Sequence, residues 1–202
     1  PGELLALTQS YPTRPPAYDR QGVGEEDLID FTPALRAEAL ERVANFRMGP
    51  IFTPPVVADP GGPYGTLMLP SAGGGTNWPG GSVDPETGIF YQYSFTNVTS
   101  LGLVNNPERS DMNFIRGNPA GVPARDRALT IRGLPLIKPP WGRISAIDLR
   151  TGDIVWQIAH GETPDNVREH PDLQGLDIPR TGRSGRVGTL ITKTLVIAGE
   201  PG

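Results

Sequence analysis

Apolar and polar residues alternate in short runs along most of the chain, a pattern typical of strands. Such runs lie at 65–69, 82–95, 142–159 and 188–199. The second and third runs each contain an Asp-x-x-Thr-Gly turn signal, so we predict a strand–turn–strand unit at each. The fourth predicts a further hairpin. The expected fold class is therefore all-β.

One stretch, residues 33–46, has helical spacing instead. Its apolar stripe consists of Leu35, Leu40, Val43 and Phe46. Thr32 is suited to be the N-cap, and Pro33 suits the first helical position, where a missing N–H costs nothing. We expect a single helix that packs over the outside of a β structure. The rest of residues 1–61 is expected to form an extended crossing segment.

The remaining chain divides into two parts. Residues 62–159 are expected to form one β unit, interrupted by an irregular, polar insertion at 100–138. Residues 160–202 are expected to be a loop, with a short helical turn near 165–169, followed by the start of another unit. Repeated strand–turn–strand units suggest a propeller or a solenoid, in which each unit buries its faces on its neighbours.

The sharpest motif lies between Ala146 and Trp156. Ala146 and Asp148 share one face of a strand, and a small residue at 146 leaves room for a close neighbour. The Asp148 carboxylate can accept backbone N–H groups at the turn, where Gly152 supplies a positive φ. Trp156 lies on the second strand of the unit and has a large, flat side chain. Its burial is expected to contribute about 2–3 kcal/mol. The plain alternative is an ordinary β-hairpin.

Composition excludes several classes of function. The net charge is −4 and the 18 basic residues are scattered, so nucleic-acid binding is disfavoured. Cysteine is absent, which excludes thiol catalysis and disulfides. No apolar run approaches the roughly 20 residues of a membrane helix, so we expect no transmembrane segment. His160 and His170 are expected to be solvated loop residues, and Trp141 a core residue.

The 146–156 motif resembles the tryptophan docking motif, A-x-D-x-x-T-G-x-x-x-W, of eight-bladed dehydrogenases that use pyrroloquinoline quinone (PQQ). Residues 19–39 and 73–91 resemble segments of the membrane-bound, glucose-dehydrogenase-like branch of that family, as does 138–149 together with 185–200. The resemblance implies that the chain is a fragment of the propeller holding about one to two blades. A start at Pro1, without an initiator Met or a signal-peptide pattern, agrees with this expectation.

The resemblance also implies a cofactor site at Asn77 and Trp78. In the family, this Asn side chain reaches the ortho-quinone oxygens of PQQ, and we expect Trp78 to pack beside the ring. A fixed amide donor stabilises the negative charge that develops on those oxygens. Glycines around it keep the backbone bare, so a flat molecule can approach. Pro79 departs from the expected pattern and removes one backbone donor. The alternatives are a flexible loop and, more weakly, a phosphate-binding loop, which lacks the helix it would need.

The implied activity is oxidation of an aldose such as glucose, or of an alcohol, by hydride transfer to PQQ. Ca²⁺ and the general base are expected to be held by residues outside this chain, which predicts that the chain alone is inactive. Electrons would pass to a membrane quinone or a cytochrome. The expected location is the periplasm, with membrane association left open. Two alternatives are a non-catalytic PQQ-like propeller that scaffolds protein assembly, and a different propeller hydrolase or lectin.

Overall fold

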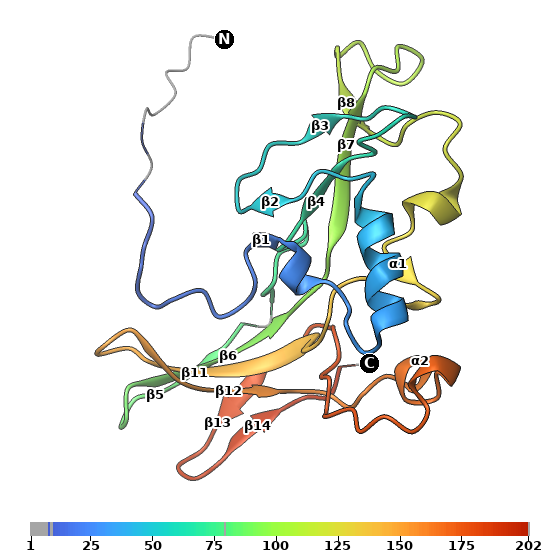
Figure 1. The fold of residues 1–202 in the computed structure, drawn as a ribbon. Helices are drawn as coiled ribbons and strands as arrows, with labels where there is room; N and C mark the ends of the chain where they lie inside the picture. The colour runs from blue at the N-terminus through green and yellow to red at the C-terminus, as the bar shows by residue number, and fades with distance from the viewer. Residues whose placement is uncertain (1–7, 9, 79, 202) are drawn as a thin grey trace.

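The computed structural model describes residues 8, 10–78 and 80–201. Pro1, Pro79 and Gly202 lie outside the described residues, and so do the expectations attached to the chain start and to Pro79. Most of the regular structure is strand, with few helices (Figure 1). No helix among the described residues has the length and apolar character needed to cross a bilayer.

The largest sheet, called the main sheet below, has four strands. They are β5 (Ser82–Asp84), β6 (Ile89–Phe95), β11 (Gly142–Asp148) and β12 (Asp153–Ala159). Their order is β12-β11-β6-β5, and every pair is antiparallel. The two predicted strand–turn–strand units are therefore confirmed. They meet edge to edge, since β6 pairs with β11 along seven residues of each strand (Figure 1).

The two turns of the main sheet have the same construction. The backbone N–H of Gly88 donates to the carbonyl of Asp84 at 2.8 Å, and Gly152 donates to Asp148 at 2.7 Å. Both glycines have positive φ, +71° and +73°, which is why glycine is needed there. The turns lie side by side, because Leu149 N donates to the Gly88 carbonyl at 2.9 Å. The repeated sequence signal thus marks two matching corners of one sheet.

A second sheet lies at the other end of the molecule (Figure 1). Its strands are β3 (Val56–Val57), β4 (Thr66–Met68), β7 (Thr99–Val104) and β8 (Ile115–Gly117). The central strand β7 pairs with all three others. The predicted strand at 65–69 is confirmed as β4.

The expectation that residues 100–138 are irregular and polar holds for 105–114 and 118–123 but is wrong for the rest of the segment. Besides most of β7 and all of β8, the segment contains the hairpin of β9 (Thr130–Ile131) and β10 (Leu134–Pro135). Around this hairpin, Ile131, Leu134, Leu136 and Ile137 are nearly or fully buried. These apolar residues are separated by a turn and a proline, so they show neither the helical nor the strand period in the sequence. Their burial draws the segment into the core.

The predicted helix is present as α1 (Pro33–Val43), three residues shorter than expected. Thr32 caps it, since its hydroxyl accepts the backbone N–H of Leu35 at 3.2 Å. The helix ends early because the next backbone groups bond elsewhere: the carbonyl of Asn45 accepts Tyr64 N at 2.7 Å, and Arg47 N donates to Gly65 O at 3.0 Å. The expectation that this helix packs over the outside of the β structure is also wrong, because one face of α1 is buried in the largest core.

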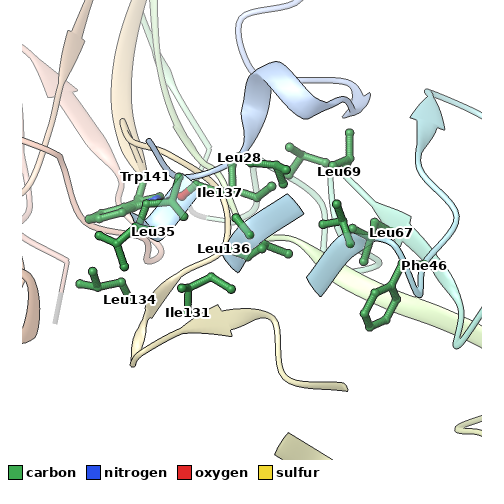
Figure 2. Close-up of a cluster of buried hydrophobic side chains, with 14 of the residues drawn as sticks. Leu28, Leu35, Phe46, Leu67, Leu69, Ile131, Leu134, Leu136, Ile137 and Trp141 are labelled. Atoms are coloured by element: carbon green, nitrogen blue, oxygen red, sulfur yellow. Dashed lines mark hydrogen bonds between the residues drawn. The ribbon is translucent and has the colours of Figure 1, made fainter. Parts of the chain in front are cut away.

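That core joins the helix to segments far apart in sequence (Figure 2). Its buried members include Leu28, Leu35, Phe46, Leu67, Leu69, Ile131, Leu134, Leu136, Ile137 and Trp141. Two backbone hydrogen bonds tie the segments together: Ile29 N donates to Leu136 O, and Lys138 N donates to Asp27 O, both at 2.8 Å. The main hydrophobic core therefore lies beside the main sheet and holds the segments that enter and leave it.

Smaller elements complete the chain. They are β1 (Gly22–Val23), β2 (Gly49–Pro50), α2 (Asp165–Arg168), β13 (Thr189–Ile191), β14 (Val196–Ala198), and 3₁₀ turns at Glu25–Asp27, Ala124–Arg127 and Pro171–Leu173. The predicted helical turn near 165–169 and the predicted hairpin at 188–199 are both confirmed, as α2 and as the antiparallel pair β13–β14.

Candidate functional site

The 146–156 motif occupies one face of the main sheet. Ala146 is fully buried and pairs with Tyr91 on β6 and with Trp156 on β12. The Tyr91 and Trp156 rings lie 5.8 Å apart, tilted by 47°. Because the two strands flank β11, these rings meet over the Ala146 methyl group. Trp156 remains 38% exposed, so the burial expected from the motif is only partial among the described residues.

Asp148 and Gly152 hold the adjoining turn. The Asp148 carboxylate accepts the Arg150 backbone N–H at 2.9 Å and its guanidinium at 2.8 Å. These bonds, the side-chain bond first, lower the pKa of Asp148 to about 2. The carboxylate thus accepts a backbone hydrogen bond within the turn, as the sequence predicted.

Residues 73–81, called the glycine loop, lead directly into β5. The loop is attached to the main sheet, since Phe95 N donates to Gly75 O at 2.7 Å. The Asn77 side chain lies within it: Oδ1 accepts Trp78 N at 2.8 Å, and Nδ2 donates to Gly73 O at a long 3.4 Å. Among the described residues, the second Nδ2 hydrogen has no acceptor, so the amide keeps donor capacity.

A hollow of about 350 Å³, the loop hollow, lies at this point. Its lining is Thr76, Asn77, Trp78, Gly80 and Gln92. Trp78 is 87% exposed and offers a flat ring face. Gly80 has φ +80°, and a Cβ there would meet nothing within 4 Å. The structure thus places Asn77 and Trp78 at one open, glycine-lined position.

The loop lies next to the first strand of the main sheet and close to the following hairpin. Thr189 of β13 donates its hydroxyl to Ser82 Oγ of β5 at 2.8 Å, and the Ser82 hydroxyl donates to the Thr189 carbonyl. β5 and β13 are therefore neighbours that belong to different sheets. The glycine loop therefore enters the main sheet at the strand that adjoins β13.

A second, larger hollow was not predicted from the sequence. Its volume is about 550 Å³. Its lining consists of residues 11–13, 15–19 and 21, within the segment 11–21 called the N-terminal arm, together with Pro70, Gly75 and Thr76. Thr76 lines this arm hollow and the loop hollow alike. No local pattern could reveal it, because its two walls are about fifty residues apart in the chain.

Beside the arm hollow, a buried polar cluster fixes the arm to the main sheet. Asp19 Oδ1 accepts the Thr96 hydroxyl at 2.8 Å and lies 3.4 Å from the Arg143 guanidinium of β11. The Asp19 and Arg143 side chains are only 8% and 10% exposed. Three buried side-chain atoms have no partner among the described residues, namely Asp19 Oδ2, Ser94 Oγ and Arg143 Nε. Ser94 and Arg143 are cross-strand partners, so all three atoms belong to this one cluster.

The histidines are tied into structure. His160 Nε2 lies 2.7 Å from the Gly199 carbonyl, and His170 Nε2 lies 3.0 Å from the Arg132 carbonyl. Both lie on loops and are partly exposed, as predicted, and each also contacts one backbone carbonyl. Trp141 is buried, as predicted, and its indole N–H donates to Ile137 O at 2.7 Å. Within residues 8, 10–78 and 80–201, no three His, Asp or Glu side chains gather as a metal site.

Four-stranded antiparallel sheets are the units from which β-propellers are built. The comparison with protein families identifies the propeller family to which the chain belongs. The model of the PQQ glucose/ethanol/alcohol dehydrogenase β-propeller domain matches residues 1–201. The chain belongs to this family, as the resemblance implied, and its fold is that of the PQQ β-propeller domain.

Similar proteins carry dehydrogenase names. The chain is 27% identical to a quinate/shikimate dehydrogenase (quinone) of Acinetobacter baylyi, over 82% of the chain and 21% of that protein. It is 32% identical to the quinoprotein glucose dehydrogenase of Escherichia coli, over 58% of the chain and 16% of that protein. It is 29% identical to the glycerol dehydrogenase large subunit of Gluconobacter thailandicus, over 78% of the chain and 23% of that protein. The chain thus spans about a fifth of the length of these relatives.

Proposed function

We propose that the chain is one section of an eight-bladed quinoprotein dehydrogenase that oxidises a sugar hydroxyl, such as that of an aldose, or an alcohol hydroxyl. The observation that carries the proposal is the placement of Asn77 and Trp78. They lie on the family's matched segment, at an open, glycine-lined hollow next to the first strand of a propeller blade. When bound, PQQ supplies the two-electron acceptor for this oxidation.

The residues present fit a planar quinone. The Asn77 amide has an uncommitted N–H, and the neighbouring Trp78 ring is flat and exposed. Gly80 leaves the backbone bare on the same hollow. In this proposal Asn77 donates a hydrogen bond to a quinone oxygen and Trp78 covers one side of the ring. A donor held in place by Gly73 and by the Trp78 backbone needs little reorganisation when charge develops on its acceptor.

Other parts of the site are proposed to come from outside this chain. Ca²⁺ and the general base fall in this group, and so does the route of electrons to a quinone or a cytochrome. The periplasm is the proposed location. Three of the relatives have names that include glucose, quinate or glycerol dehydrogenase, which supports oxidation of a hydroxyl group by the whole protein.

The test uses the complete polypeptide that carries this section. PQQ is titrated in the presence of Ca²⁺, with the absorption spectrum of bound PQQ as one readout and dye reduction with D-glucose or ethanol as another. Asn77→Ala is expected to weaken PQQ binding and to lower kcat by about 100-fold, the effect of losing one such donor. The matched control is Asn105→Ala, because Asn105 is an exposed asparagine whose side chain donates to Asn113 O.

Unchanged binding and unchanged kcat in Asn77→Ala would refute the assigned role. An intact protein that binds no PQQ would refute the enzyme and favour the scaffold alternative. The 202-residue chain alone, with added PQQ and Ca²⁺, is expected to leave the dye unreduced.

A further inference from the structure

We propose that Gln92 is a hydrogen-bond acceptor at the loop hollow, and that it stabilises the reduced form of a quinone bound there relative to the oxidised form. The inference rests on the proposed function, because it takes the loop hollow to hold PQQ. It goes further by assigning the balance between the two redox states to a residue of β6. That residue lies just outside the family-like segment 73–91, and no motif marked it.

The position of Gln92 follows from where β5 begins. Ser82, the first residue of β5, pairs with Tyr91, so Gln92 lies one residue beyond the end of that pairing. From there the glycine loop lies beside β6 in place of β5, and it is attached again where Phe95 N donates to Gly75 O at 2.7 Å. The loop hollow is found along this stretch, and Gln92 lines it from β6.

Gln92 combines deep burial with an unused acceptor. The residue is only 7% exposed, although it lines the hollow. Its Nε2 donates to the Tyr93 carbonyl at 2.7 Å, and this bond fixes the orientation of the amide, because only the nitrogen of a side-chain amide can donate. The oxygen Oε1 has no partner among the described residues. A donor bound in the loop hollow would satisfy this acceptor, and buried polar groups are normally satisfied.

The loop hollow thus offers one fixed donor and one fixed acceptor. The donor is the uncommitted N–H of Asn77 Nδ2, and the acceptor is Gln92 Oε1. Among the described residues, the lining contains no Lys, Arg, His, Asp or Glu, so hydrogen bonds rather than charges distinguish the states of a ligand there. The Thr76 hydroxyl can rotate to donate or to accept, so it favours neither state.

The two amides respond differently to the two states of a quinone. A quinone oxygen can only accept hydrogen bonds, so it suits Asn77 Nδ2 and is repelled by Gln92 Oε1. Oxidation of a substrate hydroxyl to a carbonyl releases two electrons and two protons, and with these the two quinone oxygens become hydroxyl groups. A hydroxyl group can donate to Gln92 Oε1 and still accept from Asn77 Nδ2. Gln92 therefore favours the reduced cofactor, and with it oxidation of the substrate.

The experiment measures the affinity of the complete polypeptide, with Ca²⁺, for oxidised PQQ and, without air and with a chemical reductant, for reduced PQQ. Gln92→Leu is expected to weaken binding of the reduced form by about tenfold relative to the oxidised form, the equivalent of one hydrogen bond. The same tenfold change lowers the midpoint potential of bound PQQ by about 30 mV, because the couple transfers two electrons. Gln92→Met has a more adaptable apolar side chain and is expected to give the same shift.

Gln157→Leu is the matched control. Gln157 and Gln92 are the two cross-strand partners of Ser145, so both lie on one face of the main sheet, but Gln157 does not line the loop hollow. Its replacement removes two hydrogen bonds, to Tyr18 O and to the Ser145 hydroxyl, so it also controls for a general loss of stability. The potential is expected to stay unchanged in this variant. Far-UV circular dichroism checks that each variant is folded.

The two affinities separate this inference from a purely structural role and from the proposed function. Lost packing would weaken binding of both forms equally and leave the potential unchanged; that result, or unaltered affinities in both Gln92 variants, would overturn the role of Gln92 and leave the proposed function standing. A lowered potential in a protein that binds PQQ but oxidises neither D-glucose nor ethanol would support the role of Gln92 and overturn the proposed function.

Discussion

Replacing Ala146 by a larger residue should separate two aromatic rings that meet only because residue 146 is small. Neighbouring strands lie about 4.8 Å apart, so side chains on β6 and β12 start about 10 Å from each other. Tyr91 and Trp156 nevertheless approach to 5.8 Å, across a fully buried Ala146. A leucine at 146 would occupy the space beneath both rings.

The expected cost of Ala146→Leu follows from two contributions. Over-packing of a buried site costs about 1–3 kcal/mol. Loss of the ring contact costs about 0.5–1.5 kcal/mol more. The free energy of unfolding should therefore fall by about 2–4 kcal/mol, which corresponds to a Tm lower by roughly 5–15 °C for a chain of this length.

Urea and thermal unfolding of the 202-residue chain, followed by far-UV circular dichroism, measure this change. Ala146→Gly is the control, because it keeps the rings in contact and costs only about 0.5–1 kcal/mol of strand propensity. A double-mutant cycle with Tyr91→Leu and Trp156→Leu should give a coupling energy of about 0.5–1.5 kcal/mol. A leucine variant as stable as the glycine variant would refute the packing argument.

Three further predictions concern stability. The folded pKa of Asp148 lies near 2, below its ordinary value of 3.8. Its stabilising contribution is therefore present above about pH 4 and is lost as pH falls towards 2. Between pH 4 and 2, the urea midpoint of Asp148→Asn should fall less steeply than that of the unsubstituted chain. Burial raises the pKa of Tyr93 to about 12, so its neutral form stabilises the fold below pH 10 and this contribution disappears as pH rises through 12; in Tyr93→Phe, Tm should decline less over that interval. Gly133→Ala should destabilise by about 1–2 kcal/mol through its φ of +90° alone, whereas Gly199→Ala, with equally open space and no positive φ, should be nearly neutral in the same urea assay.

The parts of the fold that were predictable from the sequence share one property: the signal is local. Turns built on Asp84 and Asp148, with a glycine four residues later, need only their own backbone, and both occur where expected. The start of α1 at Thr32 and Pro33 is equally local, because capping involves the first turn only. The end of α1 is set by pairing with residues 64 and 65, and it was misplaced for that reason.

The largest core escaped prediction because its signal is not local. Leu28 and Ile137 form an isolated bridge between segments about a hundred residues apart, and the strands around them are too short for a period to show. The candidate site divides in the same way. The family resemblance marked Asn77 and Trp78 individually, whereas Asp19 lies in a segment that resembles the family but was given no role until folding placed it against Thr96 and Arg143.

The buried cluster of Asp19, Thr96 and Arg143 joins the N-terminal arm to the main sheet. Asp19 lies on the arm, Arg143 on β11 and Thr96 just after β6, so their bonds fix the arm hollow to the main sheet that also carries the glycine loop. Arg143 Nη2 donates to the Thr96 hydroxyl at 3.0 Å and to the Pro140 carbonyl at 2.9 Å, which leaves it little freedom to move. An arm tied to the sheet that also carries the glycine loop keeps a fixed position relative to Asn77.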